Sequence, residues 1–286
     1  MGQILFAIFY TAFSMISIAP SSASHDIQLN YFEYNRGLSS PVIAQIRIGY
    51  PGYFDYTFHD VIMYDYSFFP DNSIIPNAFI DNLFSGDIVG AVKAFTEPYY
   101  GIRFYHFFKS SPNIGWGIEF IHFKVFLPGG SLQNVHITGT DGDGNSIDTY
   151  DIISNYITYF NVSHGVNHLS FSLVYRLMLF QTEKIKSGIL QPYVSLSFGI
   201  CIPHPELKLA ETEERQAYSY QLEFGNFGGG INLGFRLQFL RHLEFYFEYK
   251  FTFTWLYGMH FDNGQEGEID ASFTSNHFVW GLGLVF

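Results

Sequence analysis

The sequence predicts an all-β protein: a transmembrane antiparallel β-barrel of about eight strands, with short periplasmic turns and long extracellular loops. Three observations predict this fold class. Aromatic residues make up 20% of the chain and charged residues only 14%, well below the usual quarter. Apolar residues alternate with small or polar ones in many segments, as in strands whose two faces meet different surroundings. After the N-terminal region, the chain has no run of roughly 18 apolar residues, the length that a spanning helix needs.

The N-terminus carries the one long, mostly apolar run, residues 4–19, followed by the small residues 21–24. This pattern predicts a secretory signal peptide over residues 1–24. An N-terminal membrane anchor is the alternative, because no Lys or Arg precedes the run. Residues 25–286 are then expected to form a single outer-membrane β-barrel domain.

The last segment, residues 275–286, shows the alternation most clearly. One face is large and apolar, and the other is mostly small or polar, with Val279 and Val285 as exceptions. A terminal strand that ends on an aromatic residue is common in outer-membrane barrels, where it closes the barrel. The bulky face consists of Phe278, Trp280, Leu282, Leu284 and Phe286.

Other strands are predicted where alternating segments lie between turn residues. Short connections near Ser110, Gln181 and Arg241 are expected on the periplasmic side, together with the C-terminus. The long connections, expected outside the cell, lie near Asn72, Asp143, Glu211 and Asn263. The predicted strands before the last one are 41–58, 98–108, 115–127, 164–180, 193–202, 224–239 and 243–257.

Three segments are harder to interpret. Residues 25–40 are either an extra strand or a periplasmic lead-in, and residues 60–97 are expected to be a long outer loop with some structure of its own. Residues 128–155 are a long polar stretch. Its run from Asp141 to Ser146 begins like a calcium-binding loop but lacks the Gly and Glu that such a loop requires. We therefore interpret the run as a hairpin tip.

Strand parity places charged side chains inside the barrel. An Arg or Lys facing lipid at mid-depth would cost about 2–4 kcal/mol, and an eight-strand lumen is just wide enough to be filled by side chains. We expect the charges to pair in a network that plugs the barrel and leaves no pore. The set is Arg103, Glu119, Arg176, Arg236, Glu244, Glu248 and Lys250.

Charge and histidine content limit the function classes. The formal net charge is −12, and the 14 Lys and Arg residues do not cluster, which argues against a nucleic-acid partner. Several of the 11 His residues are expected near the outer rim, where they either bind a metal, move protons or simply sit at the water interface. His122 shares the parity of Phe120, so it faces the lumen only if a bulge turns it inward.

Several motifs, taken in order, resemble the lipid A oxidase family of outer-membrane barrels. The motifs are GWGIEFIHFKVF, NVSHGVNHLSFSLVYR, QPYVSLSFGICIPHPEL, a Gly-rich strand, EYKF and SNHFVWGLGLVF, between about Tyr99 and Phe286. The resemblance implies an enzyme of the bacterial outer membrane that oxidises the proximal glucosamine of lipid A to 2-aminogluconate with molecular oxygen. Lipopolysaccharide would be its partner, and we expect a monomer. The alternative is a non-catalytic structural or adhesive barrel.

The resemblance also implies candidate site residues at the matching positions. A neutral imidazole there could accept a proton from the anomeric hydroxyl, and a Lys could hold a lipid phosphate. A divalent metal ion held by two or three of the histidines is our own inference from the oxygen chemistry. The expected catalytic residues are Glu119, His122, His164, His168 and His277, and the expected lipid A-binding residues are Lys124, His204, Glu248 and Lys250.

Overall fold

The computed structural model describes residues 27–286, except for 41, 66–76, 97–98, 163–164, 211–215, 218–224 and 262–266. The expected signal peptide therefore lies outside the described residues. The described part is dominated by one sheet of sixteen strands. No helix in this part of the chain is long and apolar enough to cross a membrane.

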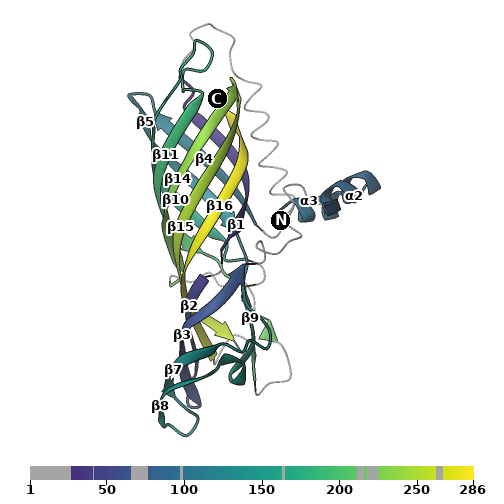
Figure 1. The fold of residues 1–286 in the computed structure, drawn as a ribbon, viewed down its shortest axis with the longest axis vertical. Helices are drawn as coiled ribbons and strands as arrows, with labels where there is room; N and C mark the ends of the chain where they lie inside the picture. The colour runs from purple at the N-terminus through teal and green to yellow at the C-terminus, as the bar shows by residue number, and fades with distance from the viewer. Residues whose placement is uncertain are drawn as a thin grey trace.

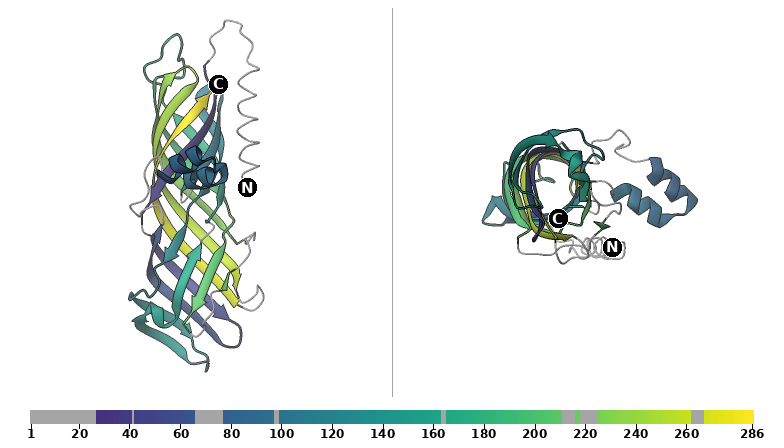
Figure 2. Two further views of the ribbon diagram at one scale, coloured as in Figure 1. Left: turned by 90° about the vertical axis from the view of Figure 1, so that its right-hand side faces the viewer. Right: turned by 90° about the horizontal axis from the view of Figure 1, so that it is seen from below.

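One section of the sheet closes on itself (Figures 1 and 2). Its strands pair antiparallel in the order β1, β4, β5, β10, β11, β14, β15, β16, and β16 pairs back with β1. We call this closed section the ring. Its strands are β1 (Asn30–Ser39), β4 (Tyr100–Phe108), β5 (Ser111–His122), β10 (His168–Arg176), β11 (Leu190–Cys201), β14 (Phe227–Leu240), β15 (Leu243–Phe261) and β16 (Gly267–Val285).

The sheet continues beyond one end of the ring, because β15 and β16 are 19 residues long and outrun their neighbours. Strand β2 pairs with the early part of β16 and leads into the rest of this section, which we call the outer lobe (lower part of Figure 1). The strands of the outer lobe are β2 (Val42–Tyr50), β3 (Phe54–Asp65), β6 (Val125–Leu127), β7 (Asn134–Thr140), β8 (Ser146–Ile152), β9 (Ile157–Val162), β12 (Pro205–Leu209) and β13 (Gln216–Ala217).

Two faces distinguish the ring strands. In β10, Leu169, Phe171 and Leu173 are exposed, whereas Ser170 and Ser172 between them are buried. The same alternation runs through β11, β14 and β16, so the outside of the ring is a continuous apolar wall. In the closing strand Phe278 and Leu282 face outward. An apolar exterior on a ring with no free edge is the arrangement that a lipid bilayer requires.

The outer lobe has a hydrophobic core that continues into the neighbouring end of the ring, where it includes Ile121 and Val279. Residues such as Ile46 in β2, Phe58 in β3 and Phe160 in β9 are completely buried, although none of these strands belongs to the ring. Pairing of β3 with β7 and of β9 with β12 holds this core together. The lobe is therefore a folded structure rather than a set of loops.

In this region the structure decides between two alternatives, corrects one expectation and specifies another. Residues 25–40 supply β1, a full member of the ring. The segment 41–58, expected to be a barrel strand, instead forms β2 and the start of β3 in the outer lobe. The segment 60–97, expected to be a long outer loop with some structure of its own, contains the end of β3 and the helices α2 (Asn77–Ser85) and α3 (Ile88–Thr96).

The connections agree with the expected alternation where they are described. The links between β4 and β5, β10 and β11, and β14 and β15 lie at the end of the ring that holds the C-terminus (Figure 1). The polar stretch 128–155 forms the β7–β8 hairpin with the short helix η2 (Ile153–Asn155) after it, and Asp143 lies at its tip. The other three expected loop centres, Asn72, Glu211 and Asn263, lie outside the described residues.

Candidate functional site

The interior of the ring is filled by charged side chains, as strand parity predicted. All seven predicted charges are buried. Arg103 occupies the middle of this network, which we call the lumenal network. Its Nη1 donates to Glu248 Oε2 at 2.7 Å and its Nη2 to the Tyr193 hydroxyl at 2.8 Å, while its Nε pairs with Glu33.

Lys250 links the network toward the outer lobe. Its Nζ donates to both carboxylate oxygens of Glu119 at 2.6 Å and lies 2.8 Å from Glu248 Oε1. The three side chains come from β5 and β15, and each is less than 5% exposed. Pairing of this quality is what makes buried charges tolerable in a barrel interior.

The other end of the network lies toward the C-terminus. Arg236 Nε donates to Glu33 Oε1 at 2.6 Å, and Glu244 lies 3.6 Å from the same nitrogen. Arg176 bonds to Gln191 Oε1 at 3.0 Å and to the Tyr31 hydroxyl. Three arginines, each with its guanidinium packed on aromatic rings, thus fill the lumen.

Two of the predicted histidines lie at the lobe end of this network. His277 pairs across β15–β16 with Lys250, and its Nε2 lies 2.9 Å from Thr252 Oγ1. The rings of Phe123 and Tyr99 cover it, at centroid distances of 5.0 and 5.7 Å. His168 is also buried on the lumenal face of β10.

His122 does not lie in the lumen with His168 and His277. No bulge turns it inward: it sits opposite Tyr100 on the outer face of the wall and stacks on that ring at 5.0 Å. The chain after β9 covers it from outside, since its Nδ1 lies 2.8 Å from Asn167 Oδ1. Gly165 is required here, because a Cβ at that position would come within 2.5 Å of the imidazole.

The remaining candidates are dispersed. Lys124 and His204 are partly exposed near the ring–lobe junction, separate from the buried Glu248 and Lys250. His164 lies outside the described residues. Among the described residues, no group of three His, Cys, Asp or Glu side chains is arranged to hold a metal ion.

Sequence reasoning missed residues that complete the lumenal network. Glu33 bridges Arg103 and Arg236, but it lies in the segment that was left open between strand and lead-in. The alternation of Tyr31, Glu33 and Asn35 with aromatic neighbours was the signal that could have found it. Tyr193 was assigned to a strand, but nothing in its sequence context showed that its hydroxyl would meet Glu248 at 2.7 Å.

An apolar wall, a closed antiparallel ring and a charged, packed interior define this chain as a membrane β-barrel protein. No protein-family model matches the sequence, and the comparison with curated proteins also gives no match.

Comparison with solved structures gives distant likenesses. The outer membrane protein OprG from Pseudomonas aeruginosa is 12% identical, with 92% of this chain and 99% of that one covered and a TM-score of 0.37. The outer membrane protease OmpT from Escherichia coli is 8% identical over 93% and 99%, with a TM-score of 0.34. Neisserial surface protein A is 7% identical over 90% and 97%, with a TM-score of 0.32. Likeness at this level carries no argument about location or function.

Proposed function

We propose that this protein is a monomeric outer-membrane barrel of eight strands whose ring is an anchor and whose outer lobe binds a partner at the cell surface. The observation that supports the proposal is the lobe itself, a β structure whose buried hydrophobic core extends beyond the ring. Closure of β1 on β16 leaves no free edge in the ring for a second subunit. This is the adhesive alternative that the sequence left open.

The packed lumen supports an anchor rather than a channel. Arg103, Arg176 and Arg236 are among the largest completely buried side chains. Glu33 bridges Arg103 and Arg236, while Arg176 bonds to Tyr31 and Gln191 in the same lumen. An eight-strand lumen filled in this way has no continuous water path.

Replacing the β7–β8 hairpin by a short Gly-Ser link tests the binding role. Cells that display the natural protein should attach to immobilised host-cell or matrix surfaces, and cells that display the shortened protein should not. A matched replacement in the connection 181–184, at the other end of the ring, should leave attachment unchanged. Equal attachment by cells lacking the protein would contradict the proposal.

Oxidation of lipid A is the second candidate function, supported by one specific observation. Five of the nine residues implied by the family resemblance lie on the lumenal face of four different strands, at the lobe end of the network. These are Glu119, His168, Glu248, Lys250 and His277. Ionisable groups at membrane depth are functional candidates by default.

The chemistry of this second candidate would depend on the two histidines. A neutral imidazole of His277 or His168 would accept the proton of the anomeric hydroxyl. Molecular oxygen, and a divalent metal if histidines hold one, would supply the oxidising power. Substrate entry would require Tyr99 and Phe123 to move away from His277, because their rings cover it.

Mass spectrometry of lipid A decides this second candidate. Aerobic cells that carry the protein should show one added oxygen on the proximal sugar, and His168→Ala and His277→Ala variants that still insert should not. Unchanged lipid A in cells with correctly inserted natural protein would rule out the oxidase and leave the binding role untouched.

A further inference from the structure

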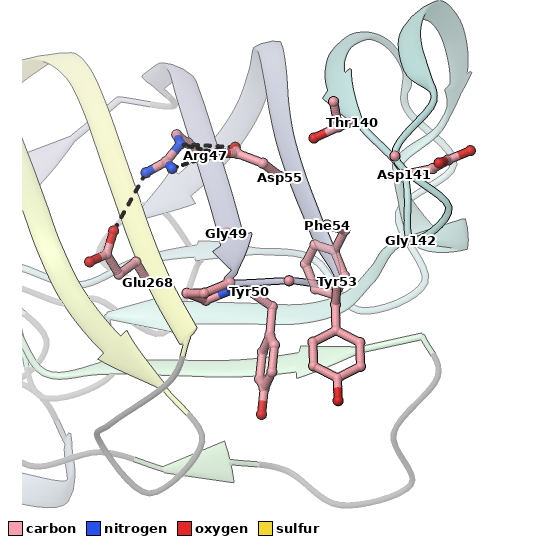
Figure 3. A pocket seen from close by; sticks show the side chains of 13 residues that line it. Arg47, Gly49, Tyr50, Tyr53, Phe54, Asp55, Thr140, Asp141, Gly142 and Glu268 are labelled. Carbon is pink, nitrogen blue, oxygen red and sulfur yellow. Dashed lines mark hydrogen bonds and ion pairs between the residues drawn. The ribbon is translucent and has the colours of Figure 1, made fainter.

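The far end of the outer lobe contains a cavity of about 400 Å³ (Figure 3). The turn between β2 and β3 forms one wall, with Tyr50, Tyr53 and Phe54. The β7–β8 hairpin supplies Asp141, and the beginning of β16 supplies Glu268. Elements that are far apart in the sequence therefore meet around one opening, at the part of the protein that is farthest from the ring (Figure 1).

The single guanidinium in this cavity is already occupied. Arg47 Nε and Nη2 donate to the Asp55 carboxylate at 2.9 and 2.6 Å, and Nη1 donates to Asp270 at 3.0 Å. The hydrogen bond to Asp55 is the main cause that raises the pKa of Arg47. Since all three nitrogens have carboxylate partners, Arg47 is poorly placed to bind an anionic ligand.

Carboxylates outnumber this guanidinium. Asp55, Asp141 and Glu268 line the cavity together with Arg47, so the lining has three negative groups against one positive, a formal charge of −2. Glu268 is the least committed, because its side chain is 49% exposed and its contact with Arg47 is 3.7 Å. The net charge of −12 on the whole chain adds attraction for a cation at longer range.

Exposed aromatic rings complete the site. Tyr53 is 64% exposed, and its ring meets Tyr50 edge-on at 5.0 Å. In Figure 3 the two tyrosine side chains extend together, away from the Arg47 ion pairs. Aromatic faces and carboxylates thus line different parts of one cavity, and each attracts ammonium and guanidinium groups.

We propose that this cavity binds a Lys- or Arg-bearing segment of a partner protein. The proposal rests on the surface-binding role proposed above and names the chemistry of the partner. A cationic head of the segment meets Glu268, and a neighbouring side chain of the segment lies on Tyr53. A neutral oligosaccharide, which would also use aromatic rings, gains nothing from the excess of carboxylates.

Peptide binding to the full chain tests the proposal. The protein is placed in nanodiscs of zwitterionic phosphatidylcholine, so that lipid charge does not attract the probe. The probe is a fluorescent peptide with several lysines, and the matched control is the same peptide with every lysine acetylated. We expect binding of the first alone, weakened by added salt as surface ion pairing requires.

Two substitutions locate the site. Tyr53→Leu and Glu268→Gln should each weaken binding by roughly five- to tenfold. Tyr257→Leu, at an exposed tyrosine of β15 outside the hairpin, and Glu183→Gln, at the opposite end of the ring, should leave it unchanged. Heat-dependent gel migration of every variant confirms that the barrel is folded.

The outcomes separate the two proposals. Equal binding of the acetylated peptide, or unchanged binding by Tyr53→Leu and Glu268→Gln, would overturn the cationic site. So would binding of a neutral oligosaccharide that Tyr53→Leu abolishes while the lysine peptide does not bind. If the lysine peptide does not bind but the hairpin replacement still abolishes attachment, the proposed surface-binding role stands and only the proposal of a cationic partner is wrong.

Discussion

Arg103 shows what a single residue does inside the ring. It meets Glu33 and Glu248 at once, and those carboxylates in turn meet Arg236 and Lys250. Without Arg103, Glu33 keeps only Arg236 and Glu248 keeps only Lys250 as a cationic partner. The lumenal network is therefore a structural unit whose parts depend on one another.

Replacing Arg103 by Met should destabilise the barrel by about 3–5 kcal/mol, because Glu33 and Glu248 lose a buried partner. Urea unfolding in lipid vesicles measures the change. Arg241→Met, in the exposed turn between β14 and β15, is the matched control and should have little effect. Equal stability of the two variants would show that the buried network does not hold the ring together.

Asp141 gives the outer lobe a local pH response. Its carboxylate accepts hydrogen bonds from the Asn145 side chain at 3.1 Å and from the Asn145 backbone amide at 2.8 Å, which lower the pKa of Asp141 below its ordinary value of 3.8. A lowered pKa means that the carboxylate stabilises the turn above pH 3.8 and stops doing so as pH falls through the folded-state value.

Hydrogen exchange at the Asn145 amide should therefore stay slow near neutral pH and quicken, beyond the intrinsic pH dependence of exchange, only at strongly acidic pH. Asp141→Asn should remove this acid response. Loss of protection already near neutral pH would show that the carboxylate does not hold the turn.

Among the elements, the contact between β1 and β16 closes the ring, and it depends on small residues. A Cβ on Gly281 would lie 2.2 Å from the Tyr34 carbonyl oxygen and 2.7 Å from the Tyr246 ring. Both groups belong to neighbouring strands, so a larger side chain at position 281 would fit only if the hydrogen bonds between these strands were broken.

Gly281→Val should therefore prevent closure, and the folded, faster-migrating band should be lost on unheated gels. Gly129→Val is the control, because a Cβ there has only one neighbour, at 3.8 Å. A normal folded band for Gly281→Val would contradict this account of the ring closure.

Strand parity explains how far the elements could be predicted. In β4, β5, β10, β14 and β15 apolar residues alternate with small or polar ones so regularly that the seven lumenal charges followed from the sequence. In β1 both faces carry aromatic side chains, and Glu33 alone is charged on the inner one, so the strand was not assigned. Strand parity also does not show where a strand lies along the barrel axis. For this reason the sequence does not distinguish β2 and β3, which lie in the lobe, from strands of the ring. The far cavity depends on contacts between distant segments, which no local pattern records.

At the scale of the whole molecule, the packed lumen separates this protein from pores. In planar bilayers the inserted protein should produce no stable conductance steps, because the lumenal network fills the ring. Discrete, reproducible steps from folded protein would show that the network opens and that transport must be reconsidered.

The central claim is that the ring crosses the membrane and the lobe stands outside the cell. Cysteine labelling of intact cells with a membrane-impermeant maleimide tests it most directly, with the buried Cys201 as background. Leu132→Cys, exposed in the lobe, should label on intact cells, and Glu183→Cys only after the outer membrane is permeabilised. Leu173→Cys, on the apolar wall, should stay unlabelled in both cases. Labelling of Glu183→Cys but not Leu132→Cys on intact cells, or ready labelling of Leu173→Cys, would contradict the account.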